Sequence, residues 1–321
     1  MVGLKRGFLV IGLGMALVTV PAWAASADAG TDALRYRLAA GQAYRVDVGI
    51  ENNIQQRTAG VIQERTLKAE LQYTCKVTDV DESGAATLEW TCEKAAVRLQ
   101  TPFETYQYSS AQKEADLPES LADYAGIAGR IFKLRLTPAA EISELEAGSE
   151  KVVVDSKDLK GANLMTLLKR FEENRTGRAI QGVIAGALSL PRMGPSSSGT
   201  GWTGDLTLPL MGSEFSSGVK LAVDQRSSEA VTLSLSGPVK RVFSKDQQLD
   251  LGRDQIYRFG ADYQLAGNVS GTAAVAAETG WVTELDYAAQ LEGEVKRNGR
   301  AVPLAVQLRM TMRSAASGDG R

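Results

Sequence analysis

Two stretches of sequence, Leu71-Gln-Tyr-Thr-Cys-Lys-Val77 and Leu88-Glu-Trp-Thr-Cys92, decide how this chain folds. In each of them large apolar residues alternate with polar ones, which is the period of a strand with one buried face. The polar segment Asp81-Glu-Ser-Gly84 lies between them and is typical of a turn. Together they predict an antiparallel β-hairpin.

The loop of this hairpin sets which residues face each other. A loop of two or four residues places Cys75 opposite Cys92 and Val77 opposite Trp90, whereas a three-residue loop places the sulfur atoms on opposite faces. The apolar alternation favours the first register. In an oxidising compartment we therefore expect a disulfide between Cys75 and Cys92. Two buried free thiols are the alternative.

The same alternation returns through most of the chain, which indicates many strands of one kind. Asn298-Gly299 lies between two alternating runs and is the strongest short hairpin signal, so we expect Val295 to pair with Val302. The other alternating runs are 44–50, 61–80, 85–100, 103–108, 131–136, 202–210, 219–224, 230–235, 281–295 and 301–312.

Helical periodicity is confined to the middle of the chain. Apolar residues recur there at the spacing of one apolar helix face, and Gly177 separates two such faces. Gly182 and Gly186 favour close packing of a helix on a sheet. The two apolar stripes are Leu164, Leu167, Leu168 and Phe171, and then Ile180, Val183, Ile184 and Ala187.

These patterns predict a mainly β fold. We expect long antiparallel strands in one or two curved sheets or half-open barrels, with a helical segment at about 157–190 packed on the sheet. A stretch rich in Pro, Gly and Ser at 191–201 divides the chain into an N-terminal β region with helices, 25–190, and a C-terminal β region, 191–321. One continuous domain is the alternative.

The first residues have the three parts of a secretory signal peptide. Lys5 and Arg6 precede the uncharged apolar run 7–20, and Ala22 and Ala24 are small residues at the positions that a signal peptidase reads. The run is shorter than the ~20 residues that a membrane-spanning helix needs. We therefore expect export, loss of segment 1–24, no membrane span after cleavage, and a soluble protein that is periplasmic or secreted.

The residue types present exclude most familiar catalytic sites. The chain contains no histidine, which excludes Ser-His-Asp triads, Cys-His pairs and histidine-bound zinc. We find no phosphate loop, dinucleotide motif or EF-hand, and we predict no cofactor, no metal and no enzyme activity. A net charge of -2 without a basic run opposes nucleic-acid binding. Because glycosidases need only two carboxylates, a histidine-free hydrolase is an alternative.

A long sheet that is apolar on one face, together with amphipathic helices, favours binding of a lipid or another apolar or amphiphilic ligand. Ordinary core packing is the alternative reading of the same residues. A module that binds an envelope protein partner through exposed strand edges is a further alternative. The candidate lining residues are Tyr73, Val77, Leu88, Trp90, Leu164, Leu167, Leu168 and Phe171.

Several short motifs together resemble a family of exported, β-rich bacterial proteins known as a domain of unknown function. They are Leu34-Arg-Tyr-Arg-Leu-Ala-Ala-Gly-Gln-Ala-Tyr44, Val80-Asp-Glu-Ser-Gly-Ala-Ala-Thr87, Phe132-Lys-Leu-Arg-Leu-Thr-Pro138, Glu141-Ile-Ser-Glu144 and Gly199-Thr-Gly-Trp202. The resemblance implies the layout and export of the chain and no activity. The layout is also similar to the half-barrels that carry lipoproteins or lipids across the periplasm, at the level of the fold only.

Overall fold

The computed structural model describes residues 34–58, 60–111, 127–147, 150–153, 175–191, 201–210, 213–243, 248–250, 256–258, 262–297 and 300–317. From Ala33 to Arg321 the chain forms one unit. The predicted signal peptide, the apolar stripe Leu164, Leu167, Leu168 and Phe171, and most of the stretch 191–201 lie outside the described residues.

Alternating sequence becomes strand through both β regions. The N-terminal strands are β1 (Ala43–Thr58), β2 (Val61–Val80), β3 (Ala86–Gln100), β4 (Thr105–Ser109), β5 (Ile131–Leu136), β6 (Ile142–Ala147) and β7 (Glu150–Val153). After helix α3 (Arg175–Ser189) come β8 (Gly201–Leu210), β9 (Ser213–Arg226), β10 (Ala230–Phe243), β11 (Gln248–Asp250), β12 (Ile256–Arg258), β13 (Asp262–Ala276), β14 (Val282–Arg297) and β15 (Arg300–Ala316).

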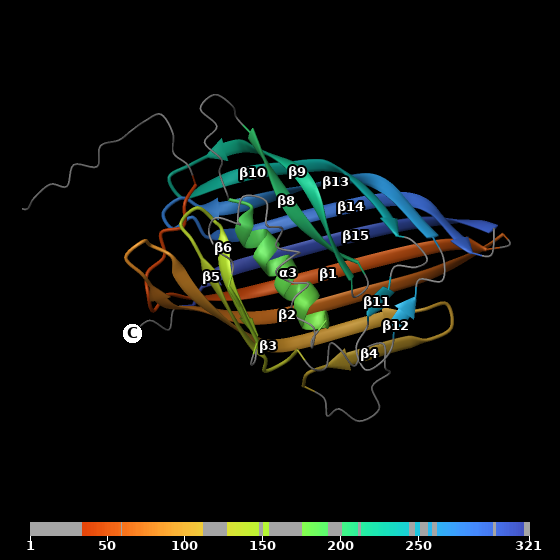
Figure 1. Ribbon diagram of the computed structural model, residues 1–321, viewed down its shortest axis with the longest axis horizontal. Helices are drawn as coiled ribbons and strands as arrows, with labels where there is room; N and C mark the ends of the chain where they lie inside the picture. The colour runs from red at the N-terminus through yellow and green to blue at the C-terminus, as the bar shows by residue number, and fades with distance from the viewer. Residues whose placement is uncertain are drawn as a thin grey trace, which may run out of the picture. The chain divides into compact units, whose positions relative to one another are not determined.

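Strands from both regions form a single antiparallel sheet of 13 strands (Figure 1). Its order is β7-β6-β5-β3-β2-β1-β15-β14-β13-β10-β9-β8, with β4 added beside β3. The first and last long strands of the chain, β1 and β15, pair along most of their length, so the two β regions meet at the centre of the sheet. The predicted mainly β, antiparallel fold is confirmed, and the sheet is not closed into a barrel.

The sheet curls strongly. Tyr36 N donates a hydrogen bond to Pro138 O at 2.9 Å, and the next amide, Arg37 N, donates to Thr279 O at 2.8 Å. Pro138 follows β5 and Thr279 precedes β14, and four strands separate β5 from β14 in the sheet order. In a flat sheet the two strands would lie about 24 Å apart. Two adjacent amides reach both turns only because the sheet is rolled.

The β2–β3 hairpin has another register than the one we predicted. Cys75 pairs with Trp90, and Cys92 pairs with Tyr73. Val77 pairs with Leu88, so each pair is displaced by two residues from the predicted one. Each sulfur atom therefore lies opposite an aromatic residue rather than opposite the other sulfur. Both cysteines are free and buried, so the predicted disulfide is wrong.

A β-bulge explains this register. Beside the turn, Val80 pairs with Ala86, and that spacing by itself would place the two cysteines on opposite faces of the sheet. The pairing shifts by one residue between Val77 and Asp79. The extra residue restores the alternation and returns both cysteines to the buried face.

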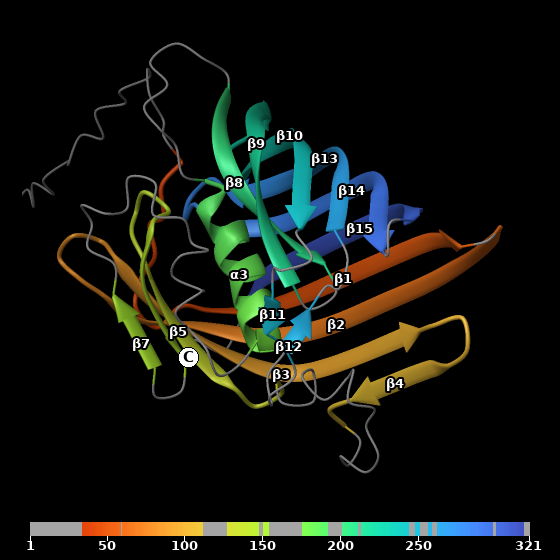
Figure 2. The same ribbon diagram turned by 45° about the vertical axis from the view of Figure 1, so that its right-hand side comes forward.

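Helix α3 packs against β8 on the inner face of the sheet (Figure 2). Val183, Ile184 and Ala187 of the predicted stripe are buried, as expected. A Cβ atom on Gly186 would approach the side chain of Thr207 in β8 to 2.9 Å, so glycine at this position permits the close helix–sheet packing that we predicted. Gly177 lies within α3 and does not break it. Among the described residues, no helix is long and apolar enough to cross a bilayer.

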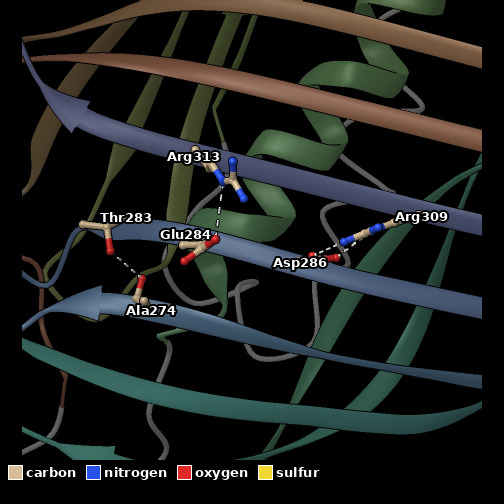
Figure 3. A network of polar contacts seen from close by, with 6 residues as sticks. All are labelled: Ala274, Thr283, Glu284, Asp286, Arg309 and Arg313. Carbon is tan, nitrogen blue, oxygen red and sulfur yellow. Dashed lines mark hydrogen bonds and ion pairs between the residues drawn. The ribbon is translucent and has the colours of Figure 1, made fainter.

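The outer face of the sheet carries charged ladders between neighbouring strands (Figure 3). Arg309 of β15 donates to the two carboxylate oxygens of Asp286 in β14 at 3.1 and 2.6 Å. Arg313 donates to Glu284 at 3.4 Å on the same pair of strands. These side chains are largely exposed, so solvent screens both ion pairs. The outer face is the polar, solvent-exposed face that the alternation predicted.

Candidate functional site

One end of the rolled sheet is closed by the chain itself. Segment 34–42 crosses this end and bonds to the β5–β6 turn, to the β13–β14 turn and to Val77 of β2. The β9–β10 turn joins them, because Ala277 N donates to Glu229 O at 2.9 Å. We call this the closed end: segment 34–42 with the turns at 81–84, 138–140, 227–229 and 277–280.

Aromatic side chains fill the interior next to the closed end. The Trp281 ring stacks on Tyr44 with centroids 4.1 Å apart, and Trp90 stacks on Phe132 at 5.8 Å. Trp90 and Trp281 lie 6.2 Å apart although three strands separate β3 from β14 in the sheet order. The six rings that touch in this cluster are Tyr36, Tyr44, Tyr73, Trp90, Phe132 and Trp281.

Side chains of the sheet and of segment 34–42 satisfy the carboxyl end of α3. The Tyr36 hydroxyl donates to Leu188 O at 2.8 Å, and Trp202 Nε1 donates to Leu190 O at 3.3 Å. The last carbonyls of a helix have no partner within the helix, so these bonds fix where α3 ends against the sheet. We did not single out Tyr36 from the sequence, although the alternation of Leu34, Tyr36 and Leu38 was a signal for it.

Burial keeps the ionisable groups of this interior neutral. It raises the pKa of Tyr36, Tyr73 and Cys75 well above their usual values. It also raises the pKa of the Cys92 thiol to about 11. A thiolate is the reactive form of cysteine, so neither thiol is activated as a nucleophile at neutral pH. These groups therefore lie in the packed core in their neutral forms.

The predicted lining residues divide into two groups. Tyr73, Val77, Leu88 and Trp90 are brought together, each at most 2% exposed, and they form part of the packed core beside the closed end. The other predicted residues, Leu164, Leu167, Leu168 and Phe171, lie outside the described residues. The first group thus contacts protein side chains. These contacts agree with ordinary core packing, which was the alternative reading of these four positions.

A buried polar side chain interrupts the apolar inner face farther along the sheet. Asn52 of β1 is 1% exposed and follows Val48 and Ile50 on the same face. Its neighbours across β2 and β15 are Leu67 and Leu308, both buried. Its Oδ1 atom has no hydrogen-bond partner among the described residues. We did not find this position from the sequence, where a single Asn within an alternating run gives no signal.

No carboxylate side chain is buried among the described residues. The buried polar side chains in this part of the chain are Asn52, Thr207 and Ser217. Among the described residues, no group of three acidic or cysteine side chains is arranged to hold a metal ion. Asp81 is held by the Ser83 hydroxyl and backbone and by Arg135, and these bonds lower the pKa of its carboxyl group. Its role is to organise the β2–β3 turn.

A shallow hollow lies on the outer face, between β2 and β3 and away from the closed end. Its volume is about 210 Å³, and Thr66, Lys68, Arg98 and Gln100 line it. Lys68 and Arg98 face each other across the two strands. Lys68 also forms an ion pair with Glu51 at 2.6 Å.

Comparisons with known proteins give a fold likeness only. No family model matches the chain, and no curated protein matches it, so the family resemblance stays a prediction. A lipovitellin structure that describes lipid–protein interactions is similar over 87% of this chain, at 9% identity and a TM-score of 0.47. The chain spans 25% of the lipovitellin chain's length.

Two further solved structures show weaker likeness. DynF from the dynemicin biosynthesis pathway of Micromonospora chersina aligns over 91% of this chain and 90% of its own, with 8% identity and a TM-score of 0.22. An outer membrane channel from Pseudomonas putida F1 aligns over 88% and 98%, with 7% identity and a TM-score of 0.20. At these scores none of the three assigns a function to this chain.

Proposed function

We propose that this chain is an exported, non-enzymatic protein of the cell envelope that binds an apolar or amphiphilic ligand against the inner face of its sheet. Export rests on the signal-peptide pattern of residues 1–24. Ligand binding rests on one structural observation, the buried Asn52 side chain in the apolar face of β1.

An unpaired amide oxygen in an apolar face requires an explanation. Leaving a buried acceptor without a donor costs about 1–3 kcal/mol, and such groups are uncommon in folded proteins. The flanking Leu67 and Leu308 offer no donor. A hydroxyl or amide of a bound amphiphile would supply the missing bond while its chain lies against the leucines. A buried water would supply it too, so the experiment has to separate these two occupants.

Two substitutions at neighbouring positions make that separation. Asn52→Leu removes the acceptor, and Leu308→Met changes the packing beside it without changing polarity. The probes are a fluorescent monoacylglycerol, which carries two hydroxyl donors, and its dimethyl ether, which carries none. We expect the wild-type protein to prefer the hydroxylated probe. Asn52→Leu should abolish this preference, with a loss of about 10-fold in affinity, and Leu308→Met should retain it.

Native mass spectrometry of gently purified wild-type protein gives the second readout, and we expect a co-purifying lipid mass. A protein that is free of lipid and binds neither probe would contradict the proposal. So would equal affinity of the wild-type protein and Asn52→Leu for the hydroxylated probe, since Asn52 then holds only water. N-terminal sequencing of the exported protein, which we expect to start at Ala25, tests the predicted export and cleavage separately.

A further inference from the structure

The end of the sheet opposite the closed end consists of hairpin turns. The β1–β2 turn lies beside the β14–β15 turn, because Gln56 near the end of β1 pairs with Leu304 near the start of β15. The β3–β4 turn lies on the other side, because Thr66 of β2 pairs with Gln100 at the end of β3. The strand ends that lead into all three turns lie at the same end of the sheet in Figure 1. We call this the hairpin end: residues 57–58 and 60–62 at the first turn, 101–104 at the second, and 297 and 300 at the third.

Three large apolar side chains are exposed to solvent at the hairpin end. Val61 is 62% exposed, Ile62 is 53% exposed and Phe103 is 86% exposed. The one other large apolar side chain exposed in the described residues, Ile131, starts β5 and lies far along β3 from Phe103. Single exposed apolar residues are ordinary, but several on adjacent turns indicate a contact surface.

The β3–β4 turn holds Phe103 in place. Thr101 N donates to Glu104 O at 2.8 Å, and the Thr101 hydroxyl accepts a bond from Glu104 N at 3.0 Å. Phe103 is therefore presented on a braced turn rather than on a loose loop.

The β1–β2 turn is apolar on both faces of the sheet. Val61 shares a face with Leu67, the inner face, whereas Ile62 and its cross-strand partner Arg57 lie on the outer face. A protein partner that packs on a sheet covers one face. An apolar medium that surrounds the whole turn suits both side chains, and the interior of a bilayer is such a medium.

Two arginines flank the β1–β2 turn in a chain whose net charge is -2. Arg57 and Arg65 are exposed beside this turn, and the hollow lined by Lys68 and Arg98 opens farther along the sheet. Two exposed acids also lie at this end: Glu64 beside the β1–β2 turn and Glu104 within the β3–β4 turn. Arginine and lysine beside apolar anchors match a surface of anionic headgroups, each contributing about 1 kcal/mol near such a surface.

We propose that the hairpin end docks on an anionic lipid bilayer. Val61, Ile62 and Phe103 enter the boundary between headgroups and acyl chains, and Arg57 and Arg65 lie at the level of the lipid phosphates. This contact does not depend on a ligand at Asn52, so it goes beyond the function proposed above.

Vesicle flotation tests the proposal with the mature protein. The vesicles are phosphatidylcholine alone and phosphatidylcholine mixed with phosphatidylglycerol. We expect the wild-type protein to float with the anionic vesicles and to be released by high salt. The triple variant Val61→Ser, Ile62→Ser and Phe103→Ser should lose about 100-fold in partitioning. Ile131→Ser is the matched control and should float like the wild-type protein.

Quenching by brominated acyl chains tests insertion directly. Trp90 and Trp281 are buried and Trp202 is half-buried, so the change in quenching relative to the wild-type protein reports the contact of the introduced tryptophan with lipid. Phe103→Trp should be quenched on anionic vesicles, and Ile131→Trp should not.

Two results would overturn the proposal. One is wild-type protein that stays with the aqueous fraction for both lipid compositions. The other is triple variant that floats as well as the wild-type protein. Dimers that are lost in the triple variant, without vesicle binding, would assign the hairpin end to self-association instead. Because probe uptake at Asn52 is measured without vesicles, either proposal can fail alone.

Discussion

The two ends of this sheet are built from similar turns yet handle apolar side chains in opposite ways. At the closed end, segment 34–42 ties the turns together, and Trp281 is 1% exposed under them. At the hairpin end, Phe103 is 86% exposed on a braced turn. An aromatic residue beside a β-turn therefore has no fixed role in this chain. What crosses the end of the sheet decides whether the residue stabilises the core or contacts the surroundings.

The largest expected difference between the ends comes from removing one aromatic ring from each. Trp281→Ala loses the stack on Tyr44 and the bond from Trp281 Nε1 to the Ser314 hydroxyl at 2.6 Å. We expect it to lower the free energy of unfolding by about 3–5 kcal/mol. Phe103→Ala should change it by at most about 0.5 kcal/mol. Urea denaturation followed by circular dichroism measures both, and similar losses for the two variants would erase the distinction between the ends.

A second pair of substitutions compares glycines with positive φ at each end. Gly280 has φ of 71° and Gly60 has φ of 84°. A Cβ atom on Gly280 would collide with the Arg35 carbonyl of the crossing segment, whereas at Gly60 nothing lies within 4 Å. Gly60→Ala should cost about 1–2 kcal/mol from the backbone conformation alone. Gly280→Ala should cost about 3 kcal/mol, because the collision adds to that strain.

Thermal unfolding of the two glycine variants supplies the measurement. If Gly280→Ala were no worse than Gly60→Ala, segment 34–42 would not be packed against the β13–β14 turn as the structure has it.

Alkaline pH should weaken the closed end and leave the hairpin end unaffected. Burial raises the pKa of Cys92 from 9.0 to about 11 in the folded protein. The folded state thus favours the neutral thiol, so this contribution to stability is complete below pH 9 and is lost as the pH rises toward 11. The loss is about 1.4 kcal/mol for each unit by which the pKa is raised. The buried Tyr36 and Tyr73 add to it at higher pH, because burial raises their pKa values too.

The unfolding free energy, measured in steps from pH 8 to pH 11, tests this prediction. Cys92→Ala should show a shallower decline than the wild-type protein. Equal slopes for the two proteins would mean that the Cys92 thiol ionises in the folded state as readily as in the unfolded chain.

Alternation and turn residues were enough to predict the strands and one register. The Asn298-Gly299 signal placed Val295 opposite Val302, and that pairing is confirmed. The predicted register of β2 and β3 was wrong for two reasons: the turn has the odd spacing that we did not favour, and a bulge between Val77 and Asp79 then adds one residue to one strand. Bulges leave the apolar alternation intact on both sides, so the sequence pattern looks the same with or without one.

The candidate site was less predictable than the fold. Tyr73, Val77, Leu88 and Trp90 were predicted as apolar lining residues, and the structure buries them in the packed core. Asn52 was not predicted because a single Asn in an alternating run gives no signal, and one of the two strands that flank it, β15, is distant in sequence. Phe103 was placed within a strand at 103–108, whereas the strand starts at Thr105 and leaves Phe103 on the turn.

The alternation in the sequence is enough to predict which residues are strand and which face of each strand is apolar, because side chains alternate with a period of two whatever their neighbours are. The curl of the sheet depends on the tertiary structure. So do the end of the sheet that is covered by segment 34–42 and the apolar residues that stay exposed to solvent. Those outcomes depend on contacts between strands hundreds of residues apart, such as β1 with β15, and no local pattern records the geometry of such contacts.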